Sequence, residues 1–115
     1  MFGGDDGRLP AELWIKAHIK RCIVDGIPAT VVHRGEKNSG ILILKLNQLD
    51  AGVRVLSQTR DMEGAIAWMP ALGGELVAEA EADAYIERAV KRDPDCWVVE
   101  IESREGRHPF EGKLL

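Results

Sequence analysis

Ile41-Leu42-Ile43-Leu44-Lys45-Leu46 is the stretch that decides the fold, because it carries apolar residues at both sets of alternating positions. Turn-forming residues bound it, with Asn38-Ser39-Gly40 before it and 47–52 after it. A strand of this composition is typical of the centre of a sheet, where both faces are covered. The stretch therefore predicts a central strand, whose neighbours come from segments before and after it in the chain.

Four further segments have strand composition, and two have the periodicity of amphipathic helices. The other predicted strands cover residues 30–34, 53–58, 65–69 and 96–102. One predicted helix opens at Pro10 and ends at Asp25-Gly26, and the other runs from about residue 78 to residue 92, before Pro94. Because short connections join the first four strands, we expect these strands to form an antiparallel meander.

The predicted fold is α+β: a mostly antiparallel five-stranded sheet with two helices, in the order α-β-β-β-β-α-β. Apolar groups fall on both sheet faces, as in Trp97-Val98-Val99, so one helix is expected on each face. A chain of 115 residues indicates one domain. We place that domain at residues 9–110, after a flexible lead over 1–8 and before a C-terminal tail over 111–115.

Composition and charge exclude several classes of protein. The net charge of −4 opposes the phosphate neutralisation that nucleic-acid binding needs, so we expect no nucleic-acid partner. No apolar segment approaches the roughly 20 residues that span a bilayer, so we expect no membrane association. The N-terminus lacks a basic region followed by an apolar one, which indicates no signal peptide and a cytoplasmic location. In that compartment Cys22 and Cys96 are expected to be reduced, buried thiols.

Several blocks of the sequence form a pattern that extends over most of the chain. The blocks are Leu9-Pro10-Ala11-Glu12-Leu13-Trp14 with His18, Lys45-Leu46-Asn47, Ala80-Glu81-Ala82-Asp83-Ala84-Tyr85-Ile86, Arg92-Asp93-Pro94-Asp95 with Trp97, and Glu102-Ser103-Arg104-Glu105-Gly106-Arg107-His108-Pro109. Together they resemble a family of short bacterial proteins, which is catalogued as domain of unknown function 1491. The resemblance covers Leu9 to Pro109 and implies a single-domain bacterial cytoplasmic protein, and it supplies no activity, cofactor or partner.

No catalytic residue, metal ligand or cofactor motif is predicted. The chain has no CxxC pair, no phosphate-binding loop and no dinucleotide fingerprint. His18 lies on the apolar face of the first predicted helix without HxH, HxxxH or HExxH spacing, so we expect a buried structural histidine. Asp61 and Glu63 offer carboxylates for acid–base chemistry, but turn formation by Asp61 is the simpler interpretation.

The C-terminal loop carries the strongest candidate for a binding site. Glycine and proline give this loop a defined shape. Its arginine and histidine side chains suit a carboxylate or phosphate ligand, which they can bind through charge-assisted hydrogen bonds. The alternative is a solvated loop whose arginines pair with Glu100 or Glu102. The predicted anion-site residues are Arg104, Arg107, His108 and Arg60.

Two classes of function remain. The first is a small protein-interaction or regulatory module without catalytic chemistry, and the second is an enzyme or small-anion binder that uses the Arg104–His108 loop. A homodimer is expected, because five strands make a sheet roughly 20–25 Å wide while one helix is only about 10–12 Å across. The apolar groups left uncovered, including Trp68 and Trp97, then favour burial against a second copy. A further, unidentified protein partner is also compatible with the first class.

Overall fold

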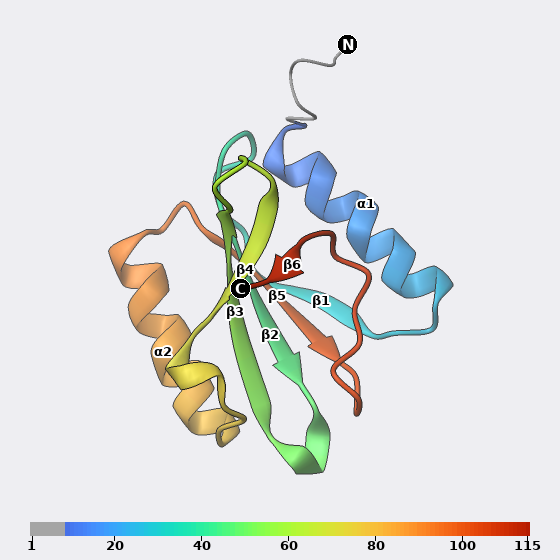
Figure 1. Ribbon diagram of the computed structural model, residues 1–115, viewed down its shortest axis with the longest axis vertical. Coiled ribbons are helices and arrows are strands. Elements are labelled where there is room, and N and C mark those ends of the chain that lie inside the picture. The colour runs from blue at the N-terminus through green and yellow to red at the C-terminus, as the bar shows by residue number, and fades with distance from the viewer. Residues whose placement is uncertain (1–8) are drawn as a thin grey trace.

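The structure, a computed structural model, describes residues 9–115, so the predicted lead over residues 1–8 lies outside the described residues. Within this range six strands form one mixed sheet, and one of the two helices lies on either side of it (Figure 1). The helices and the first five strands lie close to their predicted bounds. The elements are α1 (Ala11–Val24), β1 (Ala29–His33), β2 (Leu42–Asn47), β3 (Val53–Arg60), β4 (Ile66–Pro70), α2 (Glu79–Arg92), β5 (Trp97–Glu102) and β6 (Lys113–Leu114), with 3-10 turns at Leu49–Ala51 and Leu72–Gly74.

The strand order β1-β5-β2-β3-β4-β6 corrects the predicted sheet in two respects. First, β5 lies between β1 and β2, so the meander contains only β2, β3 and β4. Second, β2 pairs parallel with β5, and β4 pairs parallel with β6, a sixth strand formed within the predicted tail. The sheet is therefore mixed and six-stranded, while the α+β class stands.

The segment between β1 and β2 explains why these two strands do not form a hairpin. Its backbone is hydrogen-bonded to the start of β5: the Glu36 N–H donates to the Asp95 carbonyl at 2.9 Å, and the Trp97 N–H donates to the Ile41 carbonyl at 2.8 Å. A Cβ built on Gly35 or Gly40 would lie 2.2 or 2.1 Å from the Asp95 carbonyl oxygen. Only glycine allows this approach, which leaves room for β5 between the two strands.

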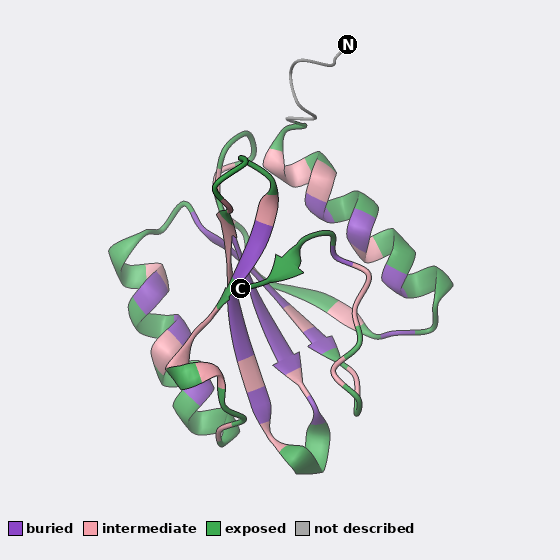
Figure 2. Cartoon of the chain, viewed as in Figure 1, coloured by how far each residue is buried: buried purple, intermediate pink, exposed green. Residues whose placement is uncertain are grey.

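The core has one layer on each face of the sheet, which confirms the prediction of one helix per face (Figure 2). In α2 the buried positions fall at helical spacing, with acidic residues in its first turn and basic residues in its last, as the helix dipole favours. The α1 layer contains Ile15, Cys22, Leu42, Leu44, Leu46, Leu56, Trp68, Trp97, Val99, Ile101 and Phe110. The α2 layer contains Ile43, Val53, Val55, Ala82, Ile86, Ala89, Cys96 and Val98.

Residues 103–112 complete the α1 layer beside the helix. Phe110 is buried among α1 and sheet residues, and the Trp68 indole N–H donates to the Glu111 carbonyl at 3.1 Å. Trp68 and Trp97 are each only 1% exposed in the single chain. The premise of the dimer expectation, that these tryptophans need a second copy to cover them, is therefore wrong. No helix within the described residues is long and apolar enough to cross a membrane.

Candidate functional site

The predicted anion site is brought together only in part. Arg107 and His108 share a shallow cavity with Asp25, whereas Arg104 reaches toward the Asp50 carboxylate at 3.8 Å. Burial lowers the pKa of His108, so its imidazole is neutral at pH 7 and adds no positive charge. Its Nδ1 accepts a hydrogen bond from the Phe110 N–H at 3.1 Å. The loop thus offers two exposed arginines rather than a joint cationic pocket.

Arg60 lies at the opposite end of the sheet from this loop. It ends β3, which runs antiparallel to β2, while β5 runs parallel to β2 and leads into the loop. The end of β5 therefore lies at the same end of the sheet as the start of β3, and Arg60 lies at the other end. The Arg60 guanidinium donates through Nη1 to the Gly64 carbonyl at 2.7 Å, within its own hairpin. Any binding by Arg60 is separate from the C-terminal loop.

Arg54, at the start of β3, is a candidate that the sequence reasoning missed. It lies on the α1 side of the sheet and lines a cavity of about 130 Å³ together with His108. The Nε of Arg54 is buried, and it has no hydrogen-bond partner among residues 9–115. The alternation of β3 placed Arg54 on the same face as Leu56, but nothing in the sequence showed that residues 103–112 cover that face. A buried unpaired donor in a cavity suits an anion.

Lys45 is the one lysine buried in the described core, and three carboxylates surround it. Its Nζ lies 2.8 Å from Glu79 Oε2, 2.8 Å from Asp83 Oδ1 and 3.7 Å from Glu100 Oε1. Burial acts to lower the pKa of Lys45, but hydrogen bonds to Asp83 and Glu79 and the attraction of Glu100 outweigh it, and the net pKa is raised. The amine therefore stays protonated, which suits an ionic clamp between β2 and α2 and not a base or nucleophile.

His18 is buried, at 4% exposure, as predicted. Its Nδ1 donates to the Trp14 carbonyl at 2.7 Å, and its ring packs against Trp14 and stacks on Phe110, with centroid distances of 3.9 and 5.2 Å. Its Nε2 lies 3.3 Å from the Glu111 carboxylate, in a geometry that makes no hydrogen bond. These contacts are those of a packed structural histidine joining α1 to the C-terminal segment.

The remaining candidate groups also have structural surroundings. Cys22 and Cys96 are free and buried, they belong to opposite core layers, and burial raises the pKa of each thiol. Asp61 accepts hydrogen bonds from the N–H groups of Ala65 and Glu63, and these bonds, led by that of Ala65, lower the pKa of its carboxyl. Turn formation by Asp61 is thus confirmed. Over residues 9–115, His, Cys, Asp and Glu side chains form no group of three or more that could hold a metal ion.

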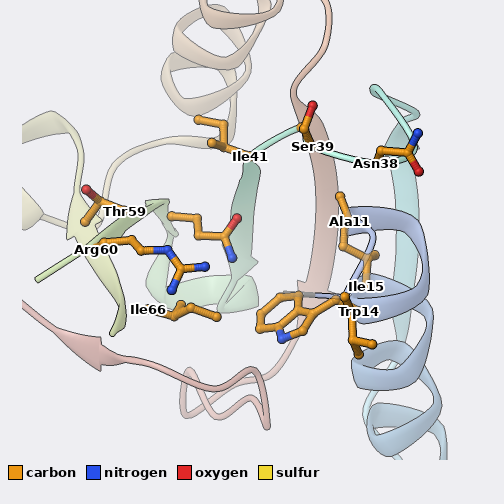
Figure 3. A pocket seen from close by; sticks show the side chains of 12 residues that line it. Ala11, Trp14, Ile15, Asn38, Ser39, Ile41, Thr59, Arg60 and Ile66 are labelled. Atoms are coloured by element: carbon orange, nitrogen blue, oxygen red, sulfur yellow. The ribbon is translucent and has the colours of Figure 1, made fainter. Parts of the chain in front are cut away.

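A pocket of about 390 Å³ opens between the start of α1 and the β3–β4 hairpin (Figure 3). Figure 3 shows the Arg60 guanidinium and the Trp14 indole pointing toward each other across it. The residues that line it are Leu9, Ala11, Trp14, Ile15, Asn38, Ser39, Gly40, Ile41, Gln58, Thr59, Arg60 and Ile66. Arg60, grouped with the C-terminal loop by the sequence reasoning, is thus part of a different site.

The free edge of β1 is a second surface feature. The Glu102 N–H donates to the Pro28 carbonyl at 3.0 Å, and bonding groups alternate along an antiparallel strand, so the N–H and C=O groups of Ala29 and Val31 face away from β5. Val32 is 54% exposed, and Ile23 and Val24, at the end of α1, are 68% and 80% exposed. The unpaired edge of β1 thus lies within a few residues of the exposed apolar side chains at the end of α1.

These features define a class of protein: a small three-layer α+β domain with a mixed sheet between two helices. Residues 9–111 match the family described as "Protein of unknown function (DUF1491)", and the chain belongs to that family. No curated protein matches the chain.

Solved structures of relatives have the same fold. The crystal structure of a DUF1491 family protein from Caulobacter crescentus CB15 is 34% identical, covers 94% of this chain and 98% of its own, and superposes with a TM-score of 0.80. An NMR structure of a DUF1491 family protein from the same organism is also 34% identical and covers 94% of this chain and 97% of its own, with a TM-score of 0.79. The solution structure of a protein from A. tumefaciens is 27% identical over 84% of this chain and 86% of its own, with a TM-score of 0.69.

Proposed function

We propose that this protein is a small cytoplasmic interaction module without catalytic chemistry of its own. The state of the ionisable groups supports the proposal, since Lys45 is held protonated, burial raises the pKa of both thiols, and Asp61 is committed to its turn. Two buried free thiols are compatible with a reducing compartment. A domain of this kind acts through a surface, and the strand edges are the first surfaces to consider.

The free edge of β1 carries this proposal. Of the two edge strands in the described sheet, β6 has only two residues, whereas β1 has five and contains no aspartate, glutamate, lysine or arginine. Natural edges are commonly protected by charge, proline or a bulge, and β1 has only a bulge between Val31 and His33 and a proline, Pro28, before it. Its outward backbone groups suit the addition of a partner strand.

A second copy of this chain is the partner that we propose for β1. Two β1 edges related by a two-fold axis pair antiparallel, and each presents the same valine side chains to the other. Ile23 and Val24, which are exposed at the end of α1, precede β1 by only a few residues and add exposed apolar side chains to this part of the chain. The dimer proposed here rests on the strand edge and not on the sheet faces, which the chain itself covers.

Light scattering coupled to size exclusion, over a micromolar dilution series, tests the dimer. We expect a mass twice that of the 12.7 kDa chain. Val32→Lys places a charge on the edge, so it should shift the protein to the monomer. Met62→Lys, at a fully exposed position in the β3–β4 hairpin, is the matched control and should stay dimeric. A single-chain mass for the wild type at every concentration overturns the dimer.

Anion binding by the C-terminal loop is a second candidate, favoured by the buried unpaired Nε of Arg54 beside His108. Phosphate at low ionic strength should then raise the melting temperature of the wild type, because a ligand that binds only the folded state stabilises it. Sulfate also stabilises proteins by exclusion from their surface, so the comparison must be made between variants. The gain should shrink in Arg54→Ala, which removes the unpaired Nε from the cavity, and in Arg107→Ala on the same loop, and it should persist in Arg88→Ala on α2. Equal gains in all four proteins exclude the site.

A further inference from the structure

The pocket between α1 and the β3–β4 hairpin has the composition of a ligand site. Its apolar wall is formed by aliphatic side chains and the Trp14 indole, from three separate parts of the chain. Leu9 and Ile41 are 55% and 43% exposed, so part of this apolar wall is open to solvent. Small-molecule sites typically have volumes of ~300–1,000 Å³ and apolar walls with a few polar groups. The volume of about 390 Å³ suits a small ligand rather than a folded segment of another protein.

Two polar side chains of this pocket, Arg60 and Gln58, have hydrogen-bond donors to offer. Arg60 is the only charged side chain among the described lining residues. Its Nη1 is engaged with the Gly64 carbonyl, which orients the guanidinium and leaves its other N–H groups available. The Gln58 Oε1 already accepts from the Leu42 N–H at 3.0 Å, so the amide of Gln58 has its N–H₂ to offer. The pocket thus has one positive charge and spare donors beside an apolar wall.

Trp14, unlike the other two tryptophans, also has an indole N–H donor to offer. The indole N–H of Trp68 donates to the Glu111 carbonyl, and that of Trp97 donates to the Glu36 carbonyl at 2.8 Å. The indole N–H of Trp14 has no hydrogen-bond partner within residues 9–115, and its ring lines the pocket opposite Arg60 (Figure 3). Nearby Asp61 does not oppose an anion at this point, because its carboxylate is bound to its own turn and to Lys113 at 3.4 Å.

We infer that this pocket binds a small amphipathic carboxylate, with its carboxylate on Arg60 and its apolar body against Trp14, Ile15, Ile41 and Ile66. A guanidinium matches the geometry of a carboxylate, and a single cation balances a single negative charge. A phosphate monoester carries about −1.5 to −2 charges at pH 7, and the pocket lacks a second cation among the described residues. The inference rests on residues outside the β1 edge and is independent of the proposed dimer.

Calorimetric titration with octanoate tests the inference, with octan-1-ol as a neutral ligand of the same chain length and inorganic phosphate as an anion without an apolar body. We expect saturable binding of octanoate, weaker binding of octan-1-ol and none of phosphate. Octanoate should also change the tryptophan fluorescence, and Trp14→Phe should remove most of that change, because Trp68 and Trp97 are buried and do not line the pocket. Equal affinity for octanoate and octan-1-ol, or no binding of octanoate, overturns the inference.

Two variants separate the charge from the apolar wall. Arg60→Gln should weaken octanoate binding about tenfold or more and leave octan-1-ol unchanged, because it removes one charge-assisted contact. Ile41→Ser should weaken both ligands about fivefold, because it removes apolar contact area. Arg88→Gln, on α2 across the sheet, is the matched control and should bind as the wild type does. Unchanged octanoate affinity in Arg60→Gln contradicts the assigned role of Arg60.

Discussion

The ammonium group of Lys45 on β2 lies 2.8 Å from the carboxylate of Asp83 on α2, so an ion pair joins the central strand to the helix that covers it. Only 7% of the Lys45 side chain is exposed, while 55% of the Asp83 side chain is. The ammonium group of Lys45 is thus buried in the core layer, whereas the carboxylate of Asp83 is in contact with water. Substitution of Lys45 is therefore expected to destabilise the fold more than substitution of Asp83.

Lys45→Met should destabilise the fold even though it replaces a buried charge by an apolar side chain. Three carboxylates, from Glu79, Asp83 and Glu100, would then face one another without a cation. Removing one partner of a fully buried pair costs about 3–5 kcal/mol, and the exposure of Glu79 and Asp83 reduces this to about 1–2 kcal/mol. Urea denaturation measures the loss. An unchanged midpoint would show that the clamp contributes nothing.

The pH dependence of that loss follows from the raised pKa of Lys45. A group whose pKa is higher in the folded than in the unfolded state stabilises fully below the unfolded value, and loses this contribution as pH rises through the folded value. The ordinary value is 10.5. The stability difference between wild type and Lys45→Met should therefore be constant through neutral pH and decrease above 10.5. A constant difference well above that pH would assign the effect to packing.

Asp83→Asn and Glu81→Gln form a matched pair on α2. Asp83 contacts Lys45, whereas Glu81 is exposed and makes no ion pair within the described residues. Asp83→Asn should cost about 1 kcal/mol, since a charge-assisted bond is lost at a half-exposed position, and Glu81→Gln should stay within about 0.5 kcal/mol. Thermal melts of the two variants give the comparison. Equal losses would mean that helix charge, and not the pair, is responsible.

His18 offers a test of packing against hydrogen bonding. His18→Ala removes a ring held between Trp14 and Phe110 and should cost about 2 kcal/mol or more. His18→Phe keeps a ring and loses only the bond to the Trp14 carbonyl, so about 1 kcal/mol is expected. Thermal melts of both variants measure the two losses, and His18→Ala is expected to melt at the lower temperature. A wild-type melting temperature for His18→Ala would contradict the buried position.

The two thiols should be unreactive until the protein unfolds. Cys22 and Cys96 are buried in different core layers, and burial raises the pKa of each, which lowers the thiolate fraction. A thiol-reactive dye should label neither cysteine in the native state and both in urea without added reductant. Absence of free thiol in the unfolded chain would show that the cysteines are oxidised, contrary to this structure.

The elements were predictable from the sequence because their signals are local. Alternation at 53–58, the spacing of Ala82, Ile86 and Ala89, and glycine or proline at the ends each act over a few residues. The strand order was not predictable, because insertion of β5 beside β2 depends on contacts of Gly35 and Gly40 with a residue distant in sequence. The same limit applies to the sites. Lys45 was visible as a charge in an apolar strand, but the carboxylates around it come from an element placed by tertiary packing.

The position of β5 between β1 and β2 has a consequence for how the chain folds. β1 has no other strand partner in the described sheet, and one side of β2 is completed only by β5, so the first strand is held by one of the last to be synthesised. The contact order is correspondingly high, which predicts slow folding relative to a simple meander. During translation, β1 stays unpaired until β5 has left the ribosome, and β2, β3 and β4 form the earliest sheet available to the nascent chain.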